Sequence, residues 1–332
     1  GQMAMTVNGA FNQFMLNYVN LDYSQVTNAR SSRNWLVEQL NGFPEKYDDF
    51  PSLYTSKHMG FGSFARSTKK RELDDIDHLI CMNADGVTYS TIGDTVYMRV
   101  PDNAQIFKGL IQTEGTYLSS IKVVNRFVKY LQNIPQYSSA AIKRNHEAAT
   151  LKLTSYTWNF DIVPCFLTTD DMFGNSYYLI PDGKGNWKKT DPRKDKERTT
   201  RVNTARDGNV LKVIRAIKYW SKFKQMPNMS SYLIENMILD YYETHSATSW
   251  VDLEVRDVLF YMSNAVYNQV QDPKGIQGNI NCLTYEERSA ISAKALGDSQ
   301  KAQDAYNNEN TNVAYAISKW REIFGSNFPT YG

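Results

Sequence analysis

The sequence predicts an α+β protein whose first part is strand-rich and whose second part is helical. Between residues 60 and 190, several short stretches alternate polar with apolar residues or run apolar throughout, which is typical of strands. From residue 209 onward, apolar residues instead recur every three or four positions, as on one face of a helix. Because 332 residues are enough for two cores, we predict a sheet-containing domain over 1–206 and a helical domain over 207–332.

Helical periodicity also opens the chain. Residues 11–41 carry apolar residues at helical spacing, and the Gly-Phe-Pro stretch at 42–44 ends the pattern. One or two amphipathic helices are expected here, and they could brace both domains from behind or simply pack on a core. Residues 115–134 predict another helix.

A turn and a pair of carboxylates give the chain its strongest functional signal. Gly62 and Ser63 predict a turn ahead of a helix that runs from Phe64 onward, where exposed backbone N–H groups can bind a phosphate. Asp75 and Asp77 lie two residues apart on a predicted strand, so both side chains project to the same side. Two carboxylates on one edge suit a divalent cation.

A third carboxylate is expected from a later strand. Residues 148–153 and 156–166 predict adjacent central strands, and Asp161 lies in the second of them. A lone aspartate in an apolar strand is costly to bury without a partner. We therefore expect Asp161 to share a cation with Asp75 and Asp77.

A hairpin and a basic segment follow these strands. Residues 176–192 carry the turn residues of a hairpin. Between Lys184 and Arg206 there are nine Lys or Arg residues against three Asp or Glu residues, and a solvated charged loop is expected for most of them. Asn203 could hydrogen-bond a base edge, because an amide offers a donor and an acceptor together, or it could serve as a loop or cap residue.

The second domain is expected to contain a series of helices. Arg215 and Lys218 lie three residues apart on the first helix, and therefore on neighbouring turns. Ser230 or Ser231 can cap the second, which places Tyr232 in its first turn. The expected helices cover residues 209–224, 230–243, 250–270, 284–308 and 311–324.

Composition excludes several classes of protein. The formal net charge is +2, which argues against binding polyanions over the whole surface. Cys81, Cys165 and Cys282 have no metal-ligand spacing and do not cluster with the four histidines, so a zinc site is not supported. The sequence has no apolar run of roughly 20 residues and no charged-then-apolar leader, which predicts a cytoplasmic protein without a membrane partner.

Three carboxylates from two strands are enough for phosphoryl transfer with two metal ions. Two cations about 3.5–4 Å apart can clamp the attacking and leaving oxygens of an in-line displacement. The leaving pyrophosphate would rest on the Gly62-Ser63 turn, and the attacking hydroxyl would lie next to Asp161. The sequence therefore predicts nucleotidyl transfer, in which catalysis depends on positioning and on neutralising charge.

Several segments resemble one family of enzymes. The Gly-Ser turn followed by two aspartates resembles the signature of DNA polymerase β-type nucleotidyltransferases. A larger set of segments, from about residue 55 to the C-terminus, resembles the bacterial cGAS/DncV-like nucleotidyltransferases; it comprises GSFARSTKKRELDDID, WNFDIVPCF, YLIPDGKGNWKKTDP, IRAIKYW, the Ser-Tyr pair and AISKWREIFGSNFP. The resemblance implies a polymerase β-like core, an oligoadenylate synthase-like helical lobe, and an active site in the cleft between them.

The resemblance also implies roles for the residues of the first domain. Asp75, Asp77 and Asp161 would bind two Mg²⁺ ions, or Mn²⁺ in their place, with Asp161 also beside the acceptor hydroxyl. Gly62 and Ser63 would hold the phosphates of the donor nucleotide.

Four residues of the helical domain match family positions that contact nucleotide. Arg215 and Lys218 would contact the triphosphate. In the Ser231-Tyr232 pair, the serine would touch phosphate and the ring would stack on a base, which any base permits.

The implied activity is synthesis of a cyclic di- or trinucleotide messenger in bacterial anti-phage (CBASS) defence. ATP, with GTP, UTP or CTP, would be the substrate, a downstream effector would receive the product, and a regulatory protein could control the enzyme. The family's animal DNA sensor has a zinc ribbon that this chain lacks, so activation by duplex DNA is not implied. The alternatives are a linear oligoadenylate synthase, a tRNA- or poly(A)-tailing enzyme, an antibiotic adenylyltransferase, and a nucleotide-binding regulator without catalysis.

Overall fold

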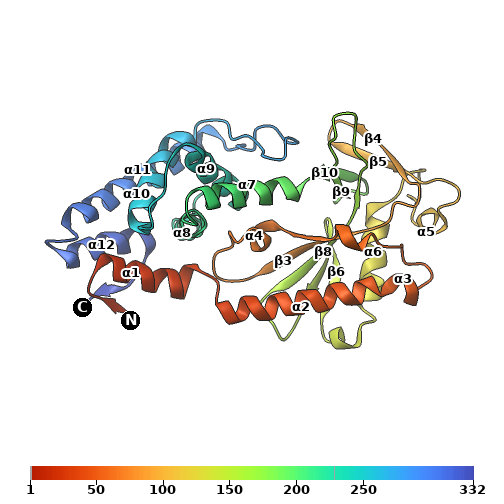
Figure 1. Ribbon diagram of the computed structural model, residues 1–332, viewed down its shortest axis with the longest axis horizontal. Helices are drawn as coiled ribbons and strands as arrows, with labels where there is room; N and C mark the ends of the chain where they lie inside the picture. Colours follow the sequence, from red (N-terminus) through yellow and green to blue (C-terminus); the bar gives the residue numbers. More distant parts are fainter. Residues whose placement is uncertain (1, 228) are drawn as a thin grey trace. The chain divides into compact units, whose positions relative to one another are not determined.

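The computed structural model describes residues 2–227 and 229–332, and these form two compact units (Figure 1). The sheet unit consists of Ser24–Ala65 and Leu73–Pro192. The helical unit consists of the N-terminal segment that ends at Tyr23, the short segment Arg66–Glu72, and Arg193–Gly332. Each unit therefore contains segments that precede the Gly-Ser turn in the sequence and segments that follow it.

These units differ in extent from the two domains expected from the sequence. The boundary lies at Pro192-Arg193, after the first residue of a helix, instead of at 206–207. The expected N-terminal pair of helices is divided, with α1 (Val7–Phe14) in the helical unit and nearly all of α2 (Tyr23–Asn41) in the sheet unit. Local periodicity predicted these helices but gave no information about which core each would join.

The helical unit is built around a single apolar core. Phe11 and Phe14 of α1 pack against Trp320, Phe324 and Phe328, with ring centroids 4.6–6.0 Å apart, so the two ends of the chain share this core. Its elements are β1 (Met3–Ala4), α1, the π-helical turn η1 (Met15–Val19), α7 (Pro192–Ala205), α8 (Leu211–Phe223), α9 (Ser231–Thr244), α10 (Val251–Ala265), α11 (Tyr285–Asn308), α12 (Val313–Phe324) and β11 (Thr330–Tyr331).

Caps account for where two of these helices begin. The Ser230 side chain accepts a hydrogen bond from the backbone N–H of Leu233 at 3.2 Å, so Ser230, and not Ser231, is the N-cap of α9. Thr284 and Glu287 form a reciprocal capping box at the start of α11. Both helices therefore start where the sequence predicts.

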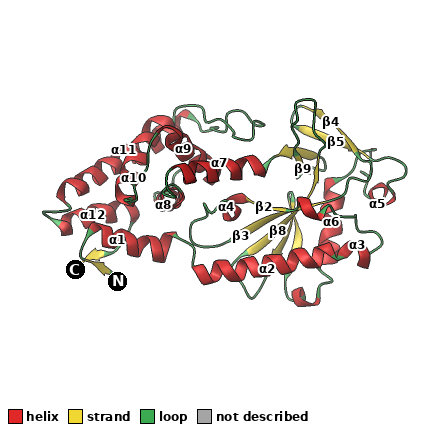
Figure 2. Ribbon diagram, viewed as in Figure 1, coloured by secondary structure: helices red, strands yellow, loops and turns green. Residues whose placement is uncertain are grey.

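The sheet unit contains a nine-stranded mixed sheet (Figure 2). The main path is β2-β3-β8-β9-β10-β5-β4, and β7 joins β6 to β8. Its strands are β2 (Met59–Phe61), β3 (Asp75–Cys81), β4 (Thr88–Ile92), β5 (Thr95–Arg99), β6 (Ala141–Asn145), β7 (Ala148–Lys152), β8 (Asn159–Leu167), β9 (Tyr178–Pro181) and β10 (Trp187–Thr190).

Helices flank this sheet. Figure 1 shows α2 running alongside the strands, and α6 (Ser120–Leu131) contacts β6 and β7. The Ser119 side chain caps α6, so this helix is shorter than the expected 115–134. The remaining helical turns are α3 (Phe43–Lys46), η2 (Thr55–Lys57), α4 (Gly62–Ala65), α5 (Gln105–Lys108) and η3 (Pro135–Tyr137).

Two expectations about local structure were wrong. The helix expected from Phe64 onward is only the single turn α4. The basic stretch expected to be a solvated loop contains the 14-residue helix α7, because its charges find partners on α9. Arg198 donates hydrogen bonds to Asn236 at 2.9 Å and also pairs with Asp240.

The cysteines fit the sequence analysis. Cys81 and Cys165 are fully buried neighbours on β3 and β8, where they act as small apolar side chains, and Cys282 is exposed. Among the described residues, no helix has both the length and the apolar composition that a membrane span requires.

Two histidines of the sheet unit are held in neutral form. His58 Nδ1 accepts a hydrogen bond from the backbone N–H of Cys81 at 2.8 Å, and its Nε2 lies 2.8 Å from Asn41 Oδ1, an arrangement that fits one ring proton. Burial lowers the pKa of His58 to about 4. Burial, with Arg33 and His58 nearby, lowers the pKa of His78 to about 3.

We predict that the sheet unit loses stability as the pH falls from about 6.5 toward 4. The unfolded chain binds protons at the ordinary histidine pKa, whereas the folded chain does not, so each histidine removes about 1.4 kcal/mol per pH unit in this window. Hydrogen exchange of β3 and β8 amides at pH 7, 6 and 5 would measure the loss. His58→Gln should flatten the pH profile, His146→Gln on an exposed turn should not, and equal profiles would contradict the assignment.

Candidate active site

Four neighbouring strands place one position each in a row across the sheet. In the register of the sheet, Phe61 lies opposite Asp77, Asp77 opposite Asp161, and Asp161 opposite Thr150. Register partners on adjacent strands direct their side chains to the same face. The two aspartates predicted from distant parts of the sequence are therefore neighbours.

The third predicted carboxylate lies one step along the same face. Asp75 lies opposite Asn159 at the start of the β3–β8 pairing. Asp75, Asp77 and Asp161 are half-buried, and further along the same face Leu79 and other apolar residues are fully covered. The carboxylates thus occupy the accessible end of a face whose other end is core.

The Gly-Ser turn begins where β2 ends, directly beside Asp77. Gly62 has a φ of +76°, and a Cβ atom at this position would lie 2.3 Å from Asp77 Oδ2. Only glycine fits here, because it tolerates this φ and leaves the space beside the carboxylate. Ser63 follows at the start of the single turn α4. Phosphate binding here would depend on a few backbone N–H groups and not on the dipole of a long helix.

Thr150 is a site residue that the sequence analysis missed. Its hydroxyl donates a hydrogen bond to Asp161 Oδ1 at 2.7 Å, and Thr150 is 5% exposed. Fixing one oxygen of the carboxylate fixes the direction of the other. The available signal was a hydroxyl residue in the middle of the otherwise apolar Ala-Ala-Thr-Leu stretch.

The three carboxylates are of the ligand type that suits magnesium, but their side chains are not gathered around a common point. In the part of the chain that the structure describes, no three His, Cys, Asp or Glu side chains are gathered closely enough to hold a metal ion. Carboxylate oxygens are the ligands that Mg²⁺ prefers, and the register supplies three of them on one face. Metal binding at this site stays a prediction.

The other predicted residues belong to the helical unit, where Lys218 is buried in an ion cluster. Lys218 Nζ donates to Glu235 Oε2 at 2.8 Å and to the backbone carbonyl of Thr68 at 2.9 Å. Arg66 binds both oxygens of Glu235 at 3.0 and 3.1 Å, and the Thr68 hydroxyl adds a third contact. Although burial opposes its ionisation, the two cations hold the pKa of Glu235 below its usual range.

Arg215 and Asn203 also make contacts within the helical unit. Arg215 donates to Asn20 Oδ1 at 2.9 Å and to the backbone carbonyl of Ser67 at 2.7 Å. Asn203 Oδ1 accepts from the backbone N–H groups of Val210 and Leu211 at the start of α8, so the structure shows the cap role. Arg215 and Lys218 therefore both hold the segment Arg66–Glu72.

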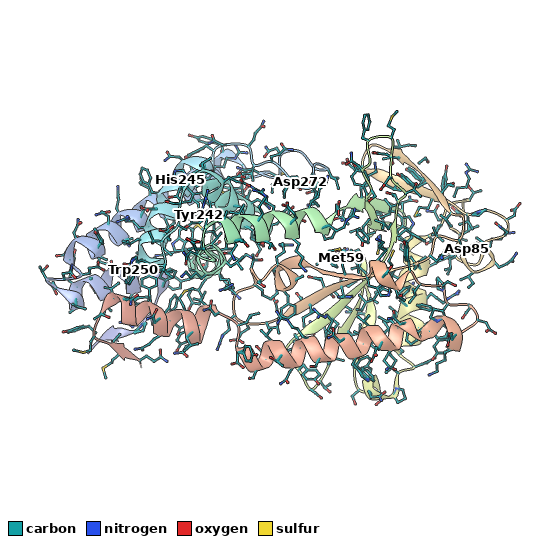
Figure 3. The ribbon with its side chains drawn as sticks, viewed as in Figure 1. Met59, Asp85, Tyr242, His245, Trp250 and Asp272 are labelled. Atoms are coloured by element: carbon teal, nitrogen blue, oxygen red, sulfur yellow. The ribbon has the colours of Figure 1, made fainter. Side chains whose placement is uncertain are left out.

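Tyr232 is the centre of a second polar cluster. Its hydroxyl donates to Asp195, lies 3.2 Å from Asp272 Oδ1 and accepts from Lys274 Nζ at 2.7 Å. Asp272, on the loop after α10, also accepts from backbone N–H groups of that loop (Figure 3). Lys274 Nζ lies 4.3 Å from the ring centroid of Tyr232, and burial raises the pKa of this hydroxyl.

The ring of Tyr232 is thus fixed in position, and neither aspartate nor Lys274 was identified from the sequence. Ser231, the first residue of α9, is exposed beside it. The Arg66 guanidinium lies 5.7 Å from the same ring centroid, which connects this cluster to the Glu235 cluster.

Comparison with known proteins identifies the family. No protein-family model matches the sequence. A probable cyclic nucleotide synthase of Bacillus cereus strain VD146 is 44% identical over 331 residues, which cover 99% of each chain. The chain belongs to the bacterial cGAS/DncV-like nucleotidyltransferases.

Solved structures of this family share the fold. CdnC of E. coli MS115-1, solved in a CdnC:HORMA-deltaN complex, matches with a TM-score of 0.71 at 17% identity over 97% of this chain and 98% of that chain. A second CdnC structure, with ATP, matches at 0.70. GTP-bound DncV of Vibrio cholerae matches with a TM-score of 0.58 at 14% identity over 82% of this chain and 69% of that chain. The predicted α+β nucleotidyltransferase fold is confirmed, and the protein is an enzyme.

We predict that Gly62→Ala abolishes nucleotide binding without unfolding the nucleotidyltransferase. The new methyl group would collide with the Asp77 carboxylate, and alanine strongly disfavours the required φ. Gly93→Ala is the matched control, because Gly93 also has a positive φ, +61°, but has nothing within 4 Å of an added Cβ. Titration with a labelled triphosphate would compare them, and equal affinities would exclude the turn from the site.

We also predict that Glu235→Ala destabilises the helical unit by about 3–5 kcal/mol, because it leaves two buried cations without a counter-charge. Glu243→Ala removes a half-exposed carboxylate that pairs with Arg201 and, at 3.4 Å, with Arg198, and it should cost at most about 1 kcal/mol. Urea unfolding measured for both variants would test the difference. A loss as small for Glu235→Ala as for Glu243→Ala would show that the cluster contributes little.

Proposed function

We propose that this nucleotidyltransferase joins nucleoside triphosphates into a cyclic di- or trinucleotide and releases pyrophosphate. The observation that carries the proposal is the strand register, which puts Asp77 and Asp161 side by side with the Gly62 turn next to them. A triphosphate at this turn would have its charged groups against the carboxylate face, an arrangement that requires cations between them.

The comparisons support the nature of the product. The relative that shares 44% identity is named a probable cyclic nucleotide synthase, and its full length is matched. A structure of CdnC contains ATP, so we propose ATP as a substrate, with GTP, UTP and CTP as the partners to be tested.

The predicted site residues of the sheet unit have distinct proposed roles. Gly62 and Ser63 bind the donor phosphates through backbone N–H groups and a hydroxyl. Asp75 and Asp77 hold magnesium against those phosphates. Asp161, oriented by Thr150, shares the metal and faces the acceptor hydroxyl. Bound Mg²⁺ would neutralise phosphate charge and make that hydroxyl more acidic.

Residues of the helical unit are proposed to act in two ways. Ser231 and Tyr232 contact the nucleotide, the serine at a phosphate and the ring against a base. Arg215 and Lys218 support triphosphate binding by holding Arg66–Glu72, the segment that follows the Gly-Ser turn in the sequence.

The biological role is proposed to be anti-phage signalling. A cyclic nucleotide acts as a messenger only if an effector binds it, so we expect a downstream effector protein. CdnC was solved in a complex with HORMA-deltaN, and this supports a regulatory protein as a further partner.

We predict that the purified protein, given an equimolar NTP mixture and Mg²⁺, makes a phosphatase-resistant cyclic product detectable by mass spectrometry. Asp77→Asn and Asp161→Asn should each lower the yield by roughly 100-fold or more, because each removes a metal ligand. Asp94→Asn, on an exposed hairpin turn, should leave the yield unchanged. A linear product, or a requirement for an RNA primer, would contradict cyclisation.

A further inference from the structure

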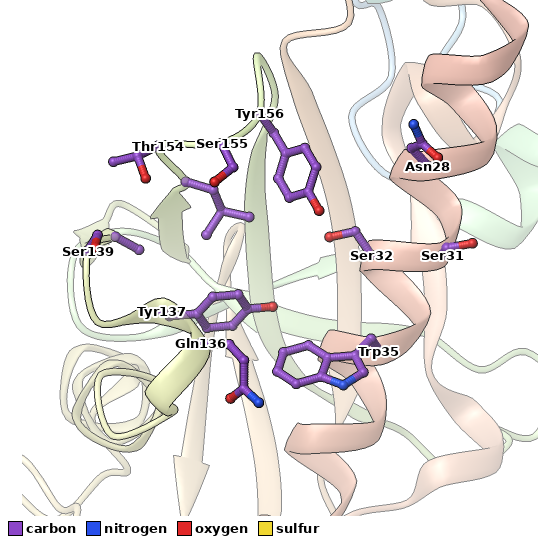
Figure 4. Close-up of a pocket in the computed structure, with 12 residues that line it drawn as sticks. Asn28, Ser31, Ser32, Trp35, Gln136, Tyr137, Ser139, Thr154, Ser155 and Tyr156 are labelled. Atoms are coloured by element: carbon purple, nitrogen blue, oxygen red, sulfur yellow. The ribbon is translucent and has the colours of Figure 1, made fainter.

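The sheet unit contains a cavity of about 690 Å³ whose lining includes none of the proposed active-site residues (Figure 4). Its walls come from α2, from η3 and the residues after it, and from the segment that leads from β7 to β8. All of these elements belong to one compact unit. The cavity is therefore a feature of the sheet unit alone.

The wall formed by α2 is polar and made of small residues. Asn28, Ser31, Ser32 and Trp35 are spaced three, four and seven residues apart, so they share one face of the helix. The fully buried residues of α2, such as Ala29 and Leu36, occupy an adjoining face. Ser31 and Ser32, at the centre of this helix face, have small side chains that leave room for the cavity, and Trp35 closes one end of it.

Aromatic side chains form much of the remaining wall. Figure 4 shows the rings of Trp35, Tyr137 and Tyr156 around the cavity, with the Tyr137 hydroxyl directed toward Ser32 and Trp35. Trp35 and Tyr137 pack edge to face at 5.6 Å, and Tyr156 stacks on Trp158 at 4.5 Å. The Tyr137 hydroxyl is buried and has no hydrogen-bond partner in the described structure.

The chemistry of the lining selects against charged ligands. Its members are Ser, Thr, Asn, Gln, Ala, Leu, Trp and Tyr residues, and none of these side chains is charged at neutral pH. A triphosphate would have no counter-charge here. Ring faces together with hydroxyl and amide groups instead match a flat, uncharged ring system that carries both hydrogen-bond donors and acceptors.

We propose that this cavity binds an uncharged nucleoside, at a site separate from the carboxylates that act on triphosphates. The base would stack on the exposed ring of Tyr156, and the ribose and base edges would face the serines and amides. Stacking of this kind is tolerant of base identity.

The cavity is connected to the catalytic strand through the chain. Tyr156 stacks on Trp158, which directly precedes β8, and β8 carries Asp161. Gln25 of α2 donates a hydrogen bond to Thr157 at 2.9 Å, so the two walls are already linked. A nucleoside bound between them would brace the segment that leads into β8, which makes the cavity a regulatory site if the proposed function holds.

Calorimetric titration of the full chain with adenosine, guanosine, cytidine and uridine, without NTPs or Mg²⁺, tests the binding directly. Saturable binding of at least one nucleoside is expected. Tyr156→Ala should weaken it roughly 5- to 150-fold, as expected for loss of a stacking ring. Tyr89→Ala removes a similarly exposed tyrosine of the same unit outside the cavity and should change nothing.

Two further variants separate this site from the active site. Ser32→Phe should fill the cavity and abolish binding, whereas Asp77→Asn should bind like the wild type. No binding of any of the four nucleosides would overturn the proposal. Binding with an affinity that Tyr156→Ala leaves unchanged, or binding that Asp77→Asn abolishes, would overturn it as well. Because no turnover is involved, these outcomes are independent of whether the protein makes a cyclic nucleotide.

Discussion

The parallel pairing of β3 with β8 is the constraint on which the proposed active site depends. Side chains alternate along a strand, so a slip of one residue would turn Asp161 to the opposite face and leave Ile162 opposite Asp77. The apolar residues of β8 oppose such a slip, because Val163 and Cys165 would lose their packing beside Leu79 and Cys81. The packing of one end of the face therefore holds the carboxylates of the other end in register. The alternation of side chains along the two strands thus determines both the geometry of the proposed site and the packing of the core.

A second constraint lies in the helical unit, where a buried carboxylate organises its surroundings. Glu235 is 1% exposed and is bound by Arg66, Thr68 and Lys218. Burying one carboxylate with two cations is favourable only when each hydrogen-bonding group has a partner, and here a backbone carbonyl takes a further donor of Lys218. The result is that a short segment far away in the sequence is fixed to α8 and α9. Lys218 is then better described as an anchor for this segment than as a freely available phosphate ligand.

The sequence predicted those parts of the site that local patterns determine. The spacing of Asp75 and Asp77 and the apolar neighbours of Asp161 were sufficient to place three carboxylates on one face, because alternation in a strand is a local property. The resemblance supplied the family, which the comparisons then showed. Thr150, Glu235 and Asp272 were missed because their roles depend on partners brought close only by the fold, such as Arg66 and Glu235, 169 residues apart.

Helix α7 was missed for the same reason. Its sequence has a strongly charged composition that resembles a solvated loop, and its stability comes from charges on α9 that lie about 40 residues later in the chain. Propensity and periodicity cannot report such contacts, since neither contains information about distant residues. Because α7 packs with the helical unit, the boundary between the units lies at Pro192-Arg193 and not at the expected 206–207.

Charge also explains why one sheet unit could bind nucleotides and nucleosides at different places. The chain has a net charge of only +2, so recognition of phosphate must be local. At the proposed site, the carboxylates would repel a triphosphate that has no bound cations, so the proposal requires a metal-bound triphosphate. At the cavity beside α2, no charge of either sign is present to offset the desolvation of a phosphate, so a phosphorylated ligand would lose its hydration without compensation. The two proposed sites would therefore distinguish ligands by the presence or absence of phosphate, before any contact with the base is made.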